Sequence, residues 1–106
     1  MTLEQVRKYA LSLPEATEQP HFAYTSFRIA GKIFATAPPE GTHVHIFVDE
    51  AQRASAIATN PDVFEMLHWG AKVVGVRAAL KSADQKTINH LLLQSYKRKA
   101  PKRSRM

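Results

Sequence analysis

The sequence contains no cysteine, and this absence removes several kinds of site at once. Without thiolates there can be no disulfide, no cysteine nucleophile, no thiolate zinc site and no iron–sulfur cluster. Glycine is also scarce, with four residues in 106, so we do not expect a glycine-rich phosphate loop. The sequence also lacks a nucleophile elbow and an HExxH pattern. We therefore expect a protein that is not an enzyme and that carries no cofactor.

Long hydrophobic runs are missing as well. No stretch of about 18 apolar residues occurs, so no membrane-spanning helix is expected. The first residues, Met1-Thr2-Leu3-Glu4-Gln5, lack the basic segment and apolar run of a signal peptide. These features predict a protein of the cytoplasm, and the length is typical of one domain.

The net charge of +6 is concentrated at the C-terminus. Residues 97–106 carry six basic side chains and no acid, whereas residues 1–96 hold nine basic and nine acidic residues. We expect a single, nearly neutral domain over residues 1–96, followed by a basic and flexible tail over residues 97–106.

The first half of the chain reads as one helix followed by strands. Thr2 and Gln5 form a capping pattern, and Pro14 ends the helix near Leu13. A polar connection over residues 15–21 then leads to three strand-like segments, which are Ala23–Ala30, Lys32–Ala37 and His43–Val48.

Two registers are open for the first hairpin. A loop at Ala30-Gly31 would pair Phe27 with Phe34, whereas a loop at Gly31-Lys32 would pair Ile29 with Phe34. In the third strand, alternation places Val44, Ile46 and Val48 on one face and His43, His45 and Phe47 on the other.

The second half reads as helix, two strands and helix. Asp49 and Gln52 predict a helix that runs to Thr59, with Ala54 and Ile57 facing the core. Residues 63–68 could form a strand or an irregular turn, and a short strand is favoured; residues 72–80 form a longer strand. Ser82 and Gln85 predict the start of a last helix that runs to about Lys99 and buries Ile88, Leu91, Leu92 and Tyr96. The predicted fold class is α+β, with a two-layer arrangement of an antiparallel sheet flanked by helices in the order α-βββ-α-ββ-α.

Four segments resemble the MmcQ/YjbR-like family. They are Leu11-Ser12-Leu13-Pro14-Glu15, Phe27-Arg28-Ile29-Ala30-Gly31-Lys32-Ile33-Phe34-Ala35, Val48-Asp49 and Trp69-Gly70. The likeness extends from about Thr2 to Tyr96. It implies a small bacterial protein with a helix-flanked antiparallel sheet, whose paired hairpins are described as two DNA-binding wings. It implies no catalytic residues.

The charges and the resemblance together favour a non-enzymatic module that binds nucleic acid. Basic side chains would contact phosphates, with weaker support from Arg28 and Lys32 on the first hairpin. Lys72, Arg77 and Lys81 on or beside the last strand could extend this surface. The main candidates are the basic residues of the C-terminal segment, namely Lys97, Arg98, Lys99, Lys102, Arg103 and Arg105.

Two alternatives stay open. The sheet face could bind a protein or a small ligand, with the tail serving solubility only. His43 and His45 have the spacing of zinc or copper ligands on a strand, but a third ligand would have to come from His21, His68 or Glu40. Two solvent-facing histidines are the simpler interpretation, so we assign no metal site.

Overall fold

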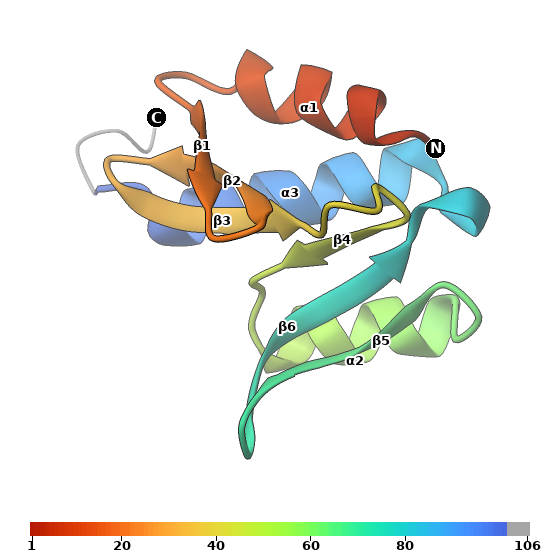
Figure 1. Cartoon of the computed structure of the whole chain (residues 1–106). Coiled ribbons are helices and arrows are strands. Elements are labelled where there is room, and N and C mark those ends of the chain that lie inside the picture. Colours follow the sequence, from red (N-terminus) through yellow and green to blue (C-terminus); the bar gives the residue numbers. More distant parts are fainter. Residues whose placement is uncertain (102–106) are drawn as a thin grey trace.

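The protein is described by a computed structural model, which covers residues 1–101. These residues form three α-helices, one 3₁₀ turn and a six-stranded antiparallel sheet with the order β1-β2-β3-β4-β6-β5 (Figure 1). The α+β class is confirmed, and the order of elements agrees with the prediction apart from one additional strand, β1. The elements are α1 (Leu3–Ser12), β1 (Thr17–His21), β2 (Tyr24–Ile29), β3 (Lys32–Ala37), β4 (His43–Ile46), α2 (Glu50–Thr59), β5 (Phe64–Trp69), β6 (Lys72–Ala79), η1 (Leu80–Ser82) and α3 (Gln85–Lys99).

Strand β1 lies where the sequence predicted a polar connection. It is an edge strand that pairs with β2 only, so Pro20 is tolerated although it has no N–H to donate. Glu18 fixes it from both sides, since Arg7 Nε of α1 donates to Glu18 Oε1 at 2.8 Å and Thr25 Oγ1 donates to Glu18 Oε2 at 2.8 Å. These contacts are tertiary, which explains why local sequence patterns missed the strand.

The β2–β3 hairpin turns at Ala30-Gly31. Both residues have positive φ, 51° and 79°, as a two-residue type I′ turn requires. The loop at Ala30-Gly31 is one of the two predicted loops. A β-bulge after Phe27, however, places Phe27 opposite Ala35 and not opposite Phe34. Both predicted pairings of Phe34 are therefore wrong.

The core lies between the sheet and helices α1 and α3. The alternation predicted for the third strand is confirmed, since Val44, Ile46 and Val48 belong to the buried cluster. The predicted apolar face of α3 is buried as well. Ser95 joins this face, where its hydroxyl donates to the Phe34 carbonyl at 2.6 Å and ties α3 to β3.

Two local predictions are wrong. Ala54 is exposed and Ala56 is buried instead, because the inward face of α2 is formed by Arg53, Ala56 and Ile57, and Ala54 lies outside that face. Ser82 does not cap α3, because residues 80–82 form a 3₁₀ turn. Asp84 is the cap, and its Oδ2 accepts from the Thr87 N–H at 3.0 Å.

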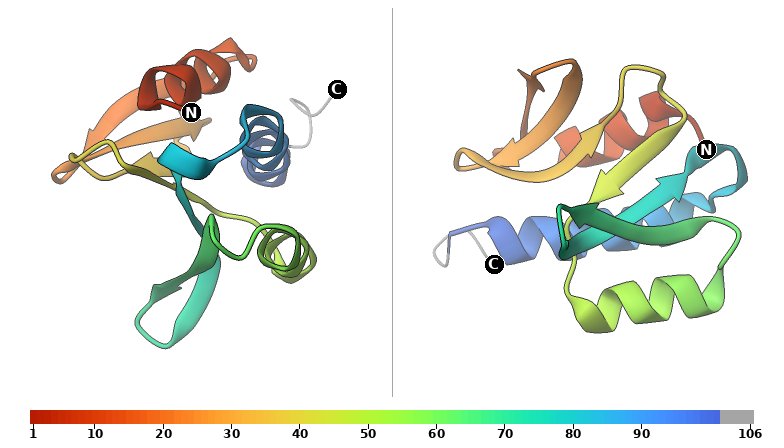
Figure 2. Two further views of the ribbon diagram at one scale, coloured as in Figure 1. Left: turned by 90° about the vertical axis from the view of Figure 1, so that its right-hand side faces the viewer. Right: turned by 60° about the horizontal axis from the view of Figure 1, so that its bottom comes forward.

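The helices lie on one side of the sheet, which leaves much of the opposite face uncovered (Figure 2). In the same views the β5–β6 hairpin diverges from β1, β2 and β3. Within residues 1–101, no helix is long and apolar enough to cross a membrane.

The pairing of β4 with β6 ends at Ile46 and Val76, and the neighbouring residue of β6, Gly75, lies close to the chain that leaves β4. A Cβ atom built on Gly75 would overlap the carbonyl oxygen of Ile46 and come within 3.0 Å of Phe47 Cα. Only a residue without a side chain allows this approach, because the atoms that it meets are backbone.

Gly75→Ala should therefore lower the free energy of unfolding by about 3 kcal/mol, the upper end for overpacking. Gly31→Ala is the matched control, since its Cβ meets nothing within 4 Å and its cost is only the positive φ, about 1 kcal/mol. Urea unfolding of both variants measures the difference. Equal losses would show that the approach at Gly75 is not a tight constraint.

His45 predicts a pH dependence of stability. Burial lowers the pKa of this imidazole below its ordinary 6.5, and the nearby charges of Arg77 and His43 lower it further. The folded state thus resists a proton that the unfolded state accepts, so stability present above pH 6.5 is lost as the pH falls below it. Unfolding between pH 7.5 and 5.5 should show a shallower pH slope for His45→Gln than for His90→Gln, a change at an exposed histidine. Parallel slopes would contradict the assignment.

Candidate functional site

A cleft with a strongly basic lining opens where the β2–β3 turn, the β5–β6 hairpin and the C-terminal end of α3 meet. Its volume is about 540 Å³. Among the described residues that line it there is no acid, and Phe47 and Trp69 supply aromatic surface. We call it the basic cleft; its cations are Lys32, Arg53, Lys72, Arg98 and Lys99.

Four separate elements deliver these cations. Lys32 begins β3 after the Ala30-Gly31 turn, and Lys72 begins β6 directly after the turn of the neighbouring hairpin. Arg98 and Lys99 come from the last turn of α3, and Arg53 comes from α2. The segments are distant in sequence, so the fold alone brings the charges together.

Two guanidinium groups are anchored to the chain that leaves β4. Arg98 Nη1 donates to the Phe47 carbonyl at 3.0 Å, and Arg53 Nη1 donates to the Val48 carbonyl at 2.8 Å. A guanidinium has five N–H donors, so each side chain keeps donors after this bond. Arg53 Nε is buried and has no partner among the described residues. The anchors thus hold the charges in place while leaving donors for a ligand.

Lys99 shows that the cations of the cleft repel one another. Its pKa is lowered by burial first and then by the neighbouring charges of Arg98 and Lys32. Its Nζ lies 5.8 Å from the centre of the Phe47 ring, which gives a weak cation–π contact. No ion pair relieves the crowding in the part of the chain that the structure describes, so a bound anion would be favoured.

Trp69 forms one edge of the cleft. Its ring meets the Phe47 ring edge-on at a centroid distance of 5.3 Å, yet 61% of the residue is exposed. An exposed aromatic beside clustered cations is the combination that binds nucleic acid strands, since bases stack on the ring while cations hold phosphates.

The structure separates the basic residues that the sequence proposed. Lys32, Arg98 and Lys99 converge in the basic cleft, while Lys97 lines an adjoining hollow of about 330 Å³ that also holds Asp49. Arg28 lies apart, because its Nε donates to Ser26 Oγ at 2.9 Å near β1. The remaining candidates, Lys102, Arg103 and Arg105, lie outside the described residues.

Sequence reasoning missed Arg53 and Trp69. Arg53 is half-buried on the same face of α2 as Ala56 and Ile57, and an arginine on the apolar face of a helix is a signal for a paired or functional charge. The wrong register for Ala54 hid that signal. Trp69 next to the turn residue Gly70 could have been read as an exposed tip.

The described residues place no third ligand beside His43 and His45, so they form no zinc or copper site. His43 Nδ1 lies 2.9 Å from Thr42 Oγ1, and His45 Nδ1 lies 3.4 Å from Thr36 Oγ1. Over residues 1–101, no three histidine or carboxylate side chains are placed to share a metal ion.

Comparison with known proteins decides the family. The model of the YjbR family matches residues 11–98. The chain belongs to the YjbR family. Among solved structures, the crystal structure of Deinococcus radiodurans protein DR2400, which carries the domain DUF419, has a TM-score of 0.77 at 18% identity. The alignment covers 91% of this chain and 76% of that one, and it shows a shared fold. No curated protein matches.

The basic cleft of this YjbR domain should bind small polyanions. Pyrophosphate at ten times its dissociation constant should add about 1.4 kcal/mol of stability, which raises the melting temperature by roughly 5–10 °C for a chain of this size. Thermal unfolding at matched ionic strength measures the shift.

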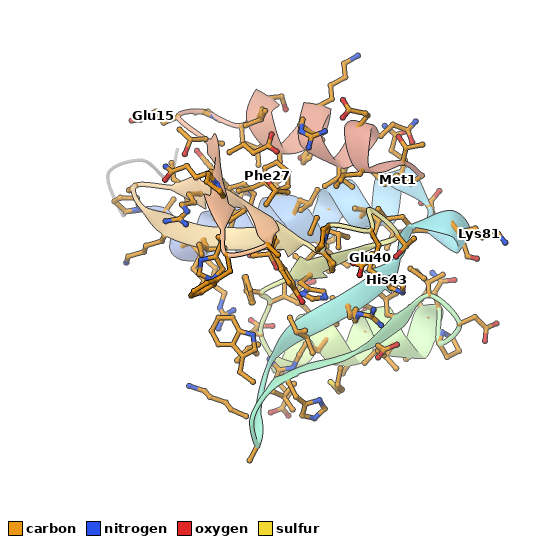
Figure 3. All side chains as sticks on the ribbon, in the orientation of Figure 1. Met1, Glu15, Phe27, Glu40, His43 and Lys81 are labelled. Carbon is orange, nitrogen blue, oxygen red and sulfur yellow. The ribbon has the colours of Figure 1, made fainter. Side chains whose placement is uncertain are left out.

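The double variant Lys32→Gln/Lys72→Gln should lose most of that shift. Lys8→Gln/Lys81→Gln removes the same charge from exposed positions, and Lys81 lies at the end of the molecule opposite to the β2–β3 turn (Figure 3). If both variants respond alike, the effect comes from net charge and the cleft has no special affinity.

Proposed function

We propose that this YjbR domain is a non-enzymatic module of the cytoplasm that binds nucleic acid by holding the phosphate backbone in the basic cleft. The observation that carries the proposal is the convergence of five cations from four elements on a cleft whose described lining contains no acid. Family membership leaves the role open, so the proposal depends on this geometry.

The charge distribution supports a backbone contact. All but three of the 15 basic residues lie within residues 1–101 together with all nine acids, so the described part of the chain is itself positive. Each phosphate that a cation neutralises releases condensed counterions, which makes affinity fall with salt. Five contacts correspond to a log–log salt slope of about −4.

Sequence selectivity is expected to be low within the basic cleft. Lysine and arginine contacts to phosphates set the position of the protein on the strand but do not read base edges. Lys32 and Lys72 are exposed and so can follow a flexible backbone.

A separate cavity supports the alternative function, which is the binding of a small ligand. The sheet face that the helices leave uncovered carries a separate cavity with an aromatic lining, so a ring-shaped ligand could bind there without the tail.

The test distinguishes binding by the basic cleft from binding by residues 102–106. The full chain, a chain ending at Pro101 and the full-length Lys32→Gln/Lys72→Gln variant are titrated with single-stranded and duplex DNA at two salt concentrations. The shortened chain should keep salt-sensitive binding, since all the residues of the cleft precede residue 102. The double variant should bind more weakly, with a salt slope reduced by about 2.

Lys8→Gln/Lys81→Gln again controls for net charge. Affinity that does not change with salt would contradict the proposal. It would also be contradicted if the shortened chain failed to bind while the double variant bound normally, because residues 102–106 would then be the contact.

A further inference from the structure

A second cavity lies on the sheet face away from the helices. Its volume is about 330 Å³, at the lower end of the range of small-ligand pockets. We call it the aromatic cavity; its lining includes His21, Phe22, Tyr24, His45, Leu67 and Trp69. None of the described residues that line it carries a lysine, arginine, aspartate or glutamate side chain, so it suits an uncharged ligand. Arg77 and Glu65 lie near His45, where their opposite charges shift its pKa in opposite directions.

Aromatic side chains around this cavity are unusually exposed. Phe22 is 94% exposed and Tyr24 38% exposed, although large rings in so small a domain are normally buried. Phe22 also has a positive φ of 58°, an uncommon conformation for a bulky residue, and it is held at the tip of the β1–β2 turn. A backbone outlier that presents an apolar ring to solvent is typical of a binding site.

His45 provides an unused polar group in the same place. The residue is buried, its ring lies 5.9 Å from the Tyr24 ring, and its Nε2 has no hydrogen-bond partner among the described residues. A buried polar atom without a partner costs stability, and a ligand that offers a ring nitrogen, amino or carbonyl group would satisfy it. The neutral imidazole can serve as donor or acceptor at Nε2, depending on which nitrogen holds the proton.

Trp69 joins the two sites. It lines both the basic cleft and the aromatic cavity, so a strand whose phosphates lie in the first passes beside the second. Bases of a duplex are stacked and paired, whereas those of a single strand can turn out onto aromatic side chains.

We propose that the aromatic cavity binds one unpaired nucleobase, stacked on its exposed aromatic rings and hydrogen-bonded at its edge by His45 Nε2. This inference rests on the proposed function and adds a preference for single strands. The cavity supplies the base contact that the basic cleft lacks.

The test uses the full chain and two single strands of equal length, one with normal bases and one with abasic sugars. Both strands carry the same phosphates, so the difference isolates the base. Trp69 is the only tryptophan, so its fluorescence reports binding directly. The normal strand should bind roughly tenfold more tightly than the abasic one, as one stacked base allows.

Phe22→Asn is the main variant, since the side chain is exposed and asparagine tolerates a positive φ. It should remove most of the preference for the normal strand and leave the affinity for the abasic strand unchanged. His45→Gln should reduce the preference too, and Leu11→Asn, an exposed apolar position on α1, should preserve it.

The outcomes separate this inference from the proposed function. Equal binding of the two strands by a protein that still responds to Lys32→Gln/Lys72→Gln would overturn the base site and leave the phosphate contact intact. Binding of neither strand would overturn both. If thymidine alone quenches Trp69 in the absence of any preference for the normal strand, the cavity takes a free ligand and the strand proposal is wrong.

Discussion

The close approach of β6 to the end of β4 is the constraint on which the functional surface depends. Because Gly75 has no side chain, the backbone of Ile46 and Phe47 can lie against it and then leave the sheet. There the Phe47 ring meets the Trp69 ring edge-on and lies near Lys99 Nζ. The β5–β6 hairpin diverges from the other strands (Figure 2). Trp69 lines both the basic cleft and the aromatic cavity, so both sites depend on this close approach of β6 to the end of β4.

The clustered cations repel one another, and hydrogen bonds to backbone carbonyls hold two of them in place. Arg53 and Arg98, from different helices, donate to the consecutive carbonyls of Val48 and Phe47. Neutral acceptors fix the guanidinium groups without cancelling their charge, as an acidic partner would. The pKa of Lys99 is lowered by burial and by its cationic neighbours, as expected of a site whose counter-charge comes from a ligand.

Local patterns predicted most of the fold, because helix caps and strand alternation act over a few residues. The caps on Thr2 and Asp49 and the apolar face of α3 are examples. The failures share a cause. Strand β1 depends on Glu18 contacting α1 and β2, and the bulge beside Phe27 depends on how β2 pairs with β3. For the site, charge counts indicated Lys32, Arg98 and Lys99 as single candidates, but only the chain topology shows that they converge with Arg53 and Lys72.

The central claim is that the basic cleft of the folded domain contacts the strand. Amide chemical shifts of the labelled full chain, followed during titration with a short single strand, test it most directly. If the cleft holds the strand, the largest changes should cluster at Gly31, Lys72 and Lys99 and include the Trp69 indole N–H, while the amide shifts of α1 stay unchanged. Changes confined to residues 102–106, or centred on α1, would contradict it.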